Sequence, residues 1–376
     1  MEIFTWNTRL GEKAVSFAIR KGKRVRAFME DAYGRTIDYL RISITDRCNL
    51  RCKYCMPKGA CLVSRREILT LEEIQAAAIA ASSLGIRHIK VTGGEPLVRS
   101  GCCELIGRLK SIPGIEKVTL TTNGILLNRY LEALDQAGID GINISLDTLE
   151  PKRYREITGR DGLEEVFSGM EKAILLGIPV KVNAVSIDWE GKREEWMALA
   201  GLAGRYPVDV RFIEMMPIGY GRDFKPFDHR ELLRGLREAY PGLEDDERVH
   251  GPGPAVYYRI PGFKGSIGLI SAMHGKFCGS CNRVRLTAQG YLKTCLCYED
   301  GADLRKVLRE GQEEFSDNGQ EGKHWRWKYR DCPDDAGLQR RLRETIVQAV
   351  RQKPAMHCFE QPDKITESRF MAAIGG

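Results

Sequence analysis

The chain has 376 residues, of which 58 are basic and 51 acidic, and its formal charge is +7. This mild basic excess suits anionic small molecules as well as nucleic acid, so charge alone excludes neither. No apolar run approaches the length of a membrane span, and the first residues lack the apolar core of a secretory signal, so we expect a soluble, cytoplasmic protein.

A basic run, IRKGKRVRAF, lies at residues 19–28 within an N-terminal extension at 1–35. Such runs occur in some organelle-targeting segments, but a solvated arm is the more common outcome. We therefore expect residues 1–35 to precede the main domain as a solvated extension.

From about residue 38 to 215, short apolar runs alternate with longer amphipathic ones. The runs predicted as strands lie at 39–44, 88–92, 117–121, 141–146, 179–186 and 209–214. Helical spacing of apolar residues is clearest at 163–177, and Gly85, Gly138 and Gly177 lie where helices should end. Six strand–helix units indicate a parallel sheet, either an open doubly wound sheet or a curved partial barrel.

Polar or glycine-rich segments follow the predicted strands. TDRCNLRCKYCMP (45–57) follows the first, TGGEP (92–96) the second, TTNG (121–124) the third and SLDT (145–148) the fourth. Ligands of parallel α/β sheets bind at the carboxyl ends of the strands. We therefore expect these segments to form one site.

The chain has twelve cysteines, too sparse for a disulfide scaffold, and six of them form two groups of three. Cys48, Cys52 and Cys55 make the first group, with C-x3-C-x2-C spacing. Three thiolates would leave one iron of a cubane cluster with an open position, and an open metal position usually serves chemistry. A structural zinc site completed by a distant His or Cys is the alternative.

Cys278, Cys281 and Cys295 make the second group, within FCGSCNRVRLTAQGYLKTC (277–295). RVRLT and YLKTC predict a hairpin around AQG, which would return Cys295 to the other two cysteines. A zinc site with Cys297 as its fourth ligand is the alternative here.

Basic residues accompany the second group. Arg283 and Arg285 alternate along a predicted strand and so share one face. Guanidinium groups bind phosphate with a planar, bidentate fork, so this pair suits an anionic substrate. Arg41 on the first strand and Lys181 on the fifth would add to the same positive surface.

CNLRCKYC after the first strand and TGGEP after the second resemble the radical S-adenosylmethionine superfamily. The resemblance implies a partial (β/α)6 TIM-like barrel at 36–220 and a C-terminal α+β extension at 221–376 that carries a second cluster. It also implies that the open iron of the first cluster binds the methionine moiety of S-adenosylmethionine. Electron transfer from that cluster would then give a 5′-deoxyadenosyl radical.

A longer series of motifs narrows the resemblance. YLRISITDRCNLRCKYCMP, TGGEPLVR, ITGRDG, RFIEMMPIG, IGLISAMHGKFCGSCNRVRLTAQG and a terminal IGG run in order. They resemble the GTP 3′,8-cyclase family from about residue 30 to 300 and again at the C-terminus. The resemblance implies a lyase with two 4Fe-4S clusters that catalyses the first step of molybdenum cofactor biosynthesis. The second cluster would bind the guanine of GTP, the ribose 3′ hydrogen would be abstracted, and the carbon radical would attack C8 of guanine.

The same resemblance implies roles for single residues. The cluster ligands would be Cys48, Cys52, Cys55, Cys278, Cys281 and Cys295. The residues that bind S-adenosylmethionine would be Tyr54, Gly94, Glu95, Ser145 and Met216. The residues that bind GTP would be Arg41, Lys90, Thr121, Lys181, Arg211, Arg283, Val284 and Arg285. In the tail, Gly375 and Gly376 would position GTP or the radical intermediate as catalytic residues.

Two features depart from the family pattern. Lys90 stands where family members commonly have arginine, which keeps the charge but loses the bidentate geometry. An insertion near 311–336 has no counterpart in the resemblance, and its polar start predicts an exposed loop. Its segment KHWRWKYR (323–330) is better explained as part of a surface insertion than as a site for a partner or polyanion.

Two other functions remain open from the residues. One is a radical enzyme that modifies peptides and carries an auxiliary cluster, and the other is a zinc-dependent nucleic-acid-binding protein. Under the favoured interpretation the partners are GTP, a reductant such as flavodoxin or ferredoxin, and a downstream cyclic pyranopterin monophosphate synthase. That interpretation includes no nucleic acid and no membrane, and it admits a homodimer.

Overall fold

Six parallel strands alternate with helices through the first half of the chain, as the sequence predicts. The computed structural model describes residues 2–5, 15–20, 23–57, 59–189, 191–310, 314–316, 323–325 and 332–375. The six strands are β4 Tyr39–Ser43, β5 His88–Thr92, β6 Lys117–Thr122, β7 Ile142–Ser145, β8 Val180–Ser186 and β9 Val208–Glu214. The helices between them are α1 Leu71–Ser83, α2 Cys102–Lys110, α3 Leu127–Gln136, α4 Pro151–Thr158, α5 Leu163–Leu175, α6 Lys192–Ala200 and α7 Leu202–Arg205. The predicted partial barrel is confirmed.

The C-terminal half extends the same sheet at both edges. Its strands are β10 Glu244–Asp245, β11 Val256–Arg259, β12 Ile267–Ile270, β13 Arg283–Leu286, β14 Tyr291–Lys293 and β15 Gly301–Asp303. The order across the twelve-stranded sheet is β10-β11-β12-β9-β8-β7-β6-β5-β4-β13-β14-β15. Strand β12 runs parallel to β9 and β13 runs parallel to β4. The hairpin of β13 and β14 forms as predicted and lies directly beside the first strand of the barrel.

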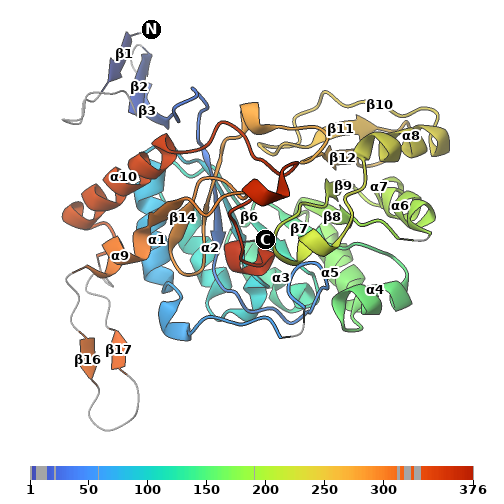
Figure 1. Ribbon diagram of the computed structural model, residues 1–376, viewed down its shortest axis with the longest axis horizontal. Coiled ribbons are helices and arrows are strands. Elements are labelled where there is room, and N and C mark those ends of the chain that lie inside the picture. Colours follow the sequence, from blue (N-terminus) through green and yellow to red (C-terminus); the bar gives the residue numbers. More distant parts are fainter. Residues whose placement is uncertain are drawn as a thin grey trace.

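The described residues of this half also form the helices α8 His229–Ala239, α9 Leu304–Arg309 and α10 Ala336–Arg351. Helix α10 lies beside α1 (Figure 1), where Gln339 donates to the carbonyl of Ala76. Helix α9 is tied to the start of α1 because Arg309 binds the carboxylate of Glu73, which also closes the capping box of α1. The division into domains at 35 and 220 stays a prediction.

The strands show why the barrel has two different faces. On β8, Val180, Val182 and Ala184 are fully buried, whereas the alternate residues Lys181 and Asn183 are only partly buried. Strands β4, β5, β6 and β13 alternate in the same way, with apolar residues buried against the helices and polar residues inside the barrel. The interior of this barrel is therefore a polar space and not a packed apolar core.

Two small sheets lie outside the main one in Figure 1. Strands β1 Glu2–Thr5, β2 Val15–Arg20 and β3 Lys23–Met29 pair in order, so the basic run at 19–28, expected as a solvated arm, takes part in two paired strands. Strands β16 Glu314–Ser316 and β17 Lys323–Trp325 form a hairpin within the insertion. The rest of KHWRWKYR lies outside the described residues. Within the described part of the chain, no helix is both long enough and apolar enough to cross a membrane.

Candidate active site

The first cysteine triad lies on the loop that follows β4. The backbone N–H groups of Cys55 and Met56 both donate to the carbonyl of Cys52, at 3.1 and 3.0 Å, which turns the loop back on itself. Arg51 donates to the carbonyl of Cys48 at 2.6 Å. All three thiols are partly buried. Burial raises the pKa of each thiol, for Cys55 to about 12.

Residues predicted to bind S-adenosylmethionine gather beside this loop. A small cavity next to Cys52 is lined by Tyr54, Ser145 and Asp147 among others. The hydroxyl of Tyr54 donates to Asp147 Oδ2 at 2.7 Å, and the other oxygen of Asp147 accepts from the backbone of Val185. The sequence motifs assign no role to Asp147, although it belongs to SLDT and lies two residues after Ser145.

Gly94 and Glu95 hold the second loop against the first. A Cβ at Gly94 would lie 2.4 Å from the carbonyl oxygen of Arg47, so only glycine allows the two loops to approach this closely. Glu95 is fully buried and accepts from Leu97 N, Thr122 Oγ1 and Asn123 N at 3.0, 2.9 and 2.7 Å. Burial raises its pKa to about 7. Its carboxylate therefore joins its own turn to the end of β6, in addition to any contact with a ligand.

Met216 does not line the cavity beside Cys52. It packs against an apolar cluster formed by Ile218, Met273, Leu296, Cys297, Phe359, Ile365 and Ile374. This cluster joins the end of β9 to the C-terminal tail.

Basic side chains from distant strands meet inside the barrel. The register pairs Arg285 with Arg41 and Arg41 with Lys90, so three cations stand side by side on neighbouring strands. Arg211 and Lys181 face the same space from β9 and β8. Burial and the neighbouring cations lower the pKa of Lys90 and of Arg285 well below their usual values, and burial lowers that of Arg41 to about 10. Like charges held this close indicate a site built for a polyanion.

Thr121 and Val284, both predicted to bind GTP, have different surroundings. Thr121 lies inside the barrel, opposite Asn143, which in turn accepts a hydrogen bond from Arg211. Val284 is buried at 2% exposure in the hydrophobic core, because it alternates with Arg283 and Arg285 along β13. Only the backbone of Val284 remains for contact with a ligand inside the barrel.

The second triad lies at the opposite end of the strands from the first. Cys278 and Cys281 precede β13, which is parallel to β4 and pairs Arg283 with Tyr39. Cys295 follows β14, which is antiparallel to β13 and so returns to the same end. The first triad thus lies at the carboxyl ends of the strands, where the sequence predicts that ligands bind, and the second triad lies at the amino end of β13 and β4. The cations of the barrel lie between the two triads.

Residues that the sequence did not single out surround the second triad. Buried Lys353 donates to the carbonyl of Arg283 at 3.0 Å, and Lys353 and Arg283 hold the pKa of Cys281 below its usual value although burial opposes this. Arg35 donates to the carbonyls of Cys278 and Ala355 at 2.9 and 2.8 Å. The contacts of Arg35 join chain segments more than 200 residues apart, which no local pattern signals.

Each triad presents three partly buried thiols, one fewer than a closed site of four ligands, and this donor set fits a cubane cluster with one open iron. In the described part of the chain, no three His, Cys, Asp or Glu side chains converge on a single ion site. Thiolates of a cubane cluster each bind a different iron and need no such convergence. Cys297, the alternative fourth ligand, instead lies with its sulfur 3.3 Å from that of Cys358.

The tail enters the space between the triads. Helical turn η6, Met371–Ile374, brings the backbone N–H of Ala372 to the thiol of Cys55. Gly375 is buried, has φ 88°, and its carbonyl accepts from Arg285 at 3.4 Å. A Cβ at Gly375 would lie 3.3 Å from that of Ser43. Gly376 lies outside the described residues.

The fold and the first triad define a radical S-adenosylmethionine enzyme. The model of the radical SAM superfamily matches residues 42–200, and that of the Molybdenum Cofactor Synthesis C family matches residues 208–359. The crystal structure of Streptococcus suis SuiB bound to S-adenosylmethionine superposes with a TM-score of 0.56 over 91% of this chain and 78% of that one. At 13% identity this likeness bears on the fold alone.

Curated relatives give the narrower assignment. A GTP 3′,8-cyclase of Clostridium perfringens (strain SM101 / Type A) is 41% identical over 349 residues, which is 93% of this chain and all of that protein. The GTP 3′,8-cyclase of Heliobacterium modesticaldum (strain ATCC 51547 / Ice1) is 44% identical over 359 residues with the same coverage. The chain belongs to the GTP 3′,8-cyclase family. This membership decides against the peptide-modifying enzyme and the zinc-dependent nucleic-acid-binding protein.

Proposed function

We propose that this protein converts GTP to (8S)-3′,8-cyclo-7,8-dihydroguanosine 5′-triphosphate, the first step of molybdenum cofactor biosynthesis. Its relatives named GTP 3′,8-cyclase, at about 40% identity over 93% of the chain, support the reaction. The observation that carries the proposal is the row of cations inside the barrel, with one cysteine triad at each end.

Cys48, Cys52 and Cys55 would hold the first cluster, and Cys278, Cys281 and Cys295 the second. When bound, the first cluster and S-adenosylmethionine supply the radical that removes the 3′ hydrogen of the GTP ribose. Tyr54, on the loop of the first triad, and Asp147, just after β7, would shape the pocket for S-adenosylmethionine beside that triad. This pocket lies at the carboxyl end of the strands.

The protein's part in the reaction is to hold GTP across the barrel. Arg41, Lys90 and Arg285 would bind the triphosphate, because a polyanion relieves the repulsion among these buried cations. Arg283 lies beside the second triad, where the guanine would meet the open iron. Binding at both ends orients the ribose toward the first triad and fixes its 3′ position.

The tail would complete the site. Gly375 contacts Arg285 and lies against Ser43, so the segment from Met371 onward borders both the triphosphate site and the first triad. We assign Gly375 and Gly376 to the positioning of GTP or of the radical intermediate.

The proposal extends to the partners. The reaction needs electrons from a reductant such as flavodoxin or ferredoxin, and its product passes to a cyclic pyranopterin monophosphate synthase. We expect a cytoplasmic location, since cluster thiolates need a reducing compartment. A homodimer is consistent with this function but is not required by it.

The test is an anaerobic reaction of the cluster-loaded protein with GTP, S-adenosylmethionine and dithionite. We expect 5′-deoxyadenosine together with a product that has the mass of GTP but a different retention time. Formation of 5′-deoxyadenosine without any isomer of GTP, also after addition of the natural reductant, would contradict the proposal.

A further inference from the structure

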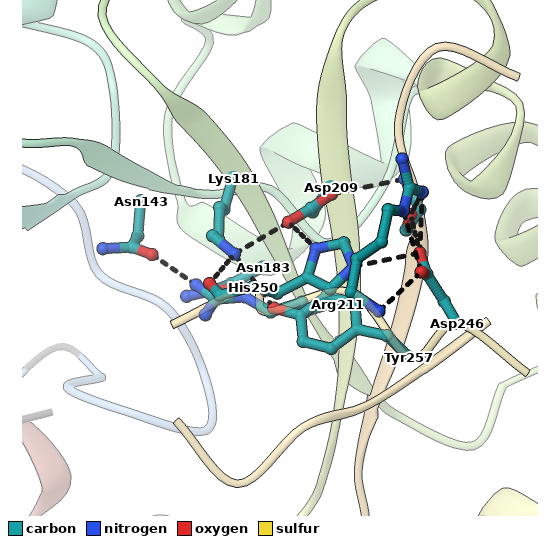
Figure 2. Close-up of polar contacts among 10 residues, drawn as sticks. Asn143, Lys181, Asn183, Asp209, Arg211, Asp246, His250 and Tyr257 are labelled. Atoms are coloured by element: carbon teal, nitrogen blue, oxygen red, sulfur yellow. Dashed lines mark hydrogen bonds and ion pairs between the residues drawn. The ribbon is translucent and has the colours of Figure 1, made fainter. Parts of the chain in front are cut away.

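The ammonium group of Lys181 is fully occupied by the protein itself. Its Nζ donates to Asp209 Oδ2 at 2.7 Å, to the carbonyl of His250 at 2.6 Å and to the hydroxyl of Tyr257 at 3.1 Å (Figure 2). An ammonium has three N–H groups, so every donor is used. A phosphate could bind Lys181 only by displacing one of these acceptors.

Asp209 is the acceptor that carries charge. It lies directly opposite Lys181 on the neighbouring parallel strand, and both side chains are mostly buried, at 16% and 22% exposure. On β4 to β9 and β13, the other charged residues at inward-facing positions are basic. On these strands, Asp209 is therefore the single inward-facing carboxylate beside the basic residues that would bind the triphosphate.

Asp209 has a second partner that holds it in place. His250 directs Nδ1 to Asp209 Oδ2 at 3.0 Å and Nε2 to Asp246 Oδ2 at 2.9 Å, and its ring stacks on Tyr257 at 3.9 Å (Figure 2). If Lys181 leaves, Asp209 keeps its contact with His250 and is not left as an unpaired buried charge. Lysine suits such a movement because its ammonium sits on a flexible four-carbon stem.

The carboxylate is ionised under ordinary conditions. Although burial opposes it, Lys181 and His250 hold the pKa of Asp209 below its usual value. Asp209 is thus a permanent negative charge in the free protein.

We propose that Asp209 is an internal counter-ion that competes with the phosphates of GTP for Lys181 and thereby limits the affinity for GTP. The free barrel is stabilised by the Lys181–Asp209 pair, and the incoming triphosphate takes over Lys181 while His250 retains Asp209. This inference rests on the proposed function and on the role in GTP binding that the family resemblance implies for Lys181.

The test is the Asp209→Asn variant, which keeps the shape and removes the charge. Cluster-loaded protein is titrated with GTP, and separately with inorganic triphosphate, in the absence of S-adenosylmethionine so that no turnover occurs. Because Lys181 no longer has a charged competitor, we expect roughly tenfold tighter binding of both ligands, the effect of one charge-assisted contact. A merely structural role predicts the opposite sign, since loss of the pair would loosen the site.

Asp246→Asn is the matched control. Asp246 is buried in the same network and contacts His250, Arg248 and Ser266, but it does not contact Lys181. This variant should lose thermal stability with a change in GTP affinity of less than about threefold.

A double-mutant cycle assigns the effect to Lys181. In the Lys181→Met background, Asp209→Asn should change the affinity by less than about twofold. Unchanged or weaker GTP binding by the single Asp209→Asn variant, with normal iron content, would overturn the proposal. So would a tenfold gain that persists without Lys181. Failure of the unaltered protein to bind GTP would instead overturn the proposed function.

Discussion

Cys52 and Cys281 are the middle cysteines of two triads with different surroundings. Burial, Cys55 and Asp147 raise the pKa of Cys52, whereas Lys353 and Arg283 hold that of Cys281 below its usual value. Positive charge beside Cys281 stabilises its thiolate before any metal binds, whereas in the first triad burial outweighs the nearby Arg51 and raises the pKa of Cys48. The two clusters thus lie in different electrostatic environments, as separate roles require.

Substitution of either cysteine should separate those roles. We expect Cys52→Ala to reduce cleavage of S-adenosylmethionine to background, because the first cluster loses a ligand. Cys281→Ala should retain part of the cleavage but give no cyclised product. The measurement is 5′-deoxyadenosine and cyclised nucleotide in one anaerobic assay, with iron analysis of each variant. Equal loss of cleavage in both variants, with the first cluster intact, would argue against the division.

The buried ammonium group of Lys90, placed among other cations of the site, is expected to lower the stability of the folded protein. Burial, Arg211 and Arg41 lower its pKa well below 10.5, so folding penalises the charged form of Lys90 relative to the unfolded chain. The destabilisation is therefore greatest at low pH and disappears as the pH rises toward 10.5. Lys90→Met should raise the melting temperature of the ligand-free protein more at pH 7 than at pH 10, and it should weaken GTP binding. An equal shift of the melting temperature at both pH values would show that the fold does not lower the pKa of Lys90.

Strand β14 is joined to the C-terminal segment by a buried ion pair. Lys293 on this strand and Glu367 are both fully buried and bind each other, and Arg369 adds a second cation at 2.9 Å. The pair fixes the hairpin that carries Cys295 against the segment that leads to the tail. A fully buried ion pair matters for stability mainly because removal of one partner leaves the other as an unpaired buried charge.

Glu367→Ala should therefore cost about 3–5 kcal/mol of unfolding free energy, since it leaves Lys293 buried without its partner. Hydrogen exchange should show faster exchange at residues 354–375 than in the unaltered protein. Glu360→Ala is the control, because it breaks the exposed pair of Glu360 and Lys276 in the same segment and should change stability little. If both variants unfold alike, the buried pair is not the anchor of the tail.

The C-terminal tail lies over the parallel strands in Figure 1, where it contacts residues from distant parts of the chain. It meets Cys55 from the first triad, Ser43 from β4 and Arg285 from β13. Deletion of Gly375 and Gly376 should leave iron content and binding of S-adenosylmethionine intact but stop cyclisation. A peptide that ends in AAIGG should restore part of the activity. Cyclisation at the full rate by the truncated protein would show that the tail has no role in the reaction.

Gly375→Ala offers a subtler test with a matched control. Gly375 and Gly177 both have positive φ, at 88° and 73°, so alanine strains the backbone at both positions. Only at Gly375 does the added methyl also meet the interior of the barrel, since nothing lies within 4 Å of a Cβ at Gly177. We expect reduced cyclisation for Gly375→Ala and normal cyclisation for Gly177→Ala, measured per intact cluster.

Local patterns in the sequence determined the strands, the helix ends and the two cysteine triads of this protein. Alternation of apolar residues fixes the six strands and their inward and outward faces, and it already implies that Val284 points away from Arg283 and Arg285. Glycines fix the helix ends, with positive φ at Gly85, Gly138 and Gly177. The spacing of the cysteines determines the two triads, because ligands of one cluster must lie close along the chain or be returned by a tight hairpin.

Only the tertiary structure decided where the two triads, the cations and the tail lie relative to one another. The parallel pairing of β13 with β4, more than 200 residues apart, puts the second triad at the opposite end of the strands and the cations between the triads. The same holds for the Lys181–Asp209 pair, for Arg35 at the second triad, and for the tail at Arg285. Pairing between distant strands depends on how the entire sheet curves and which edges remain unpaired, and neither property is encoded in any short stretch of residues.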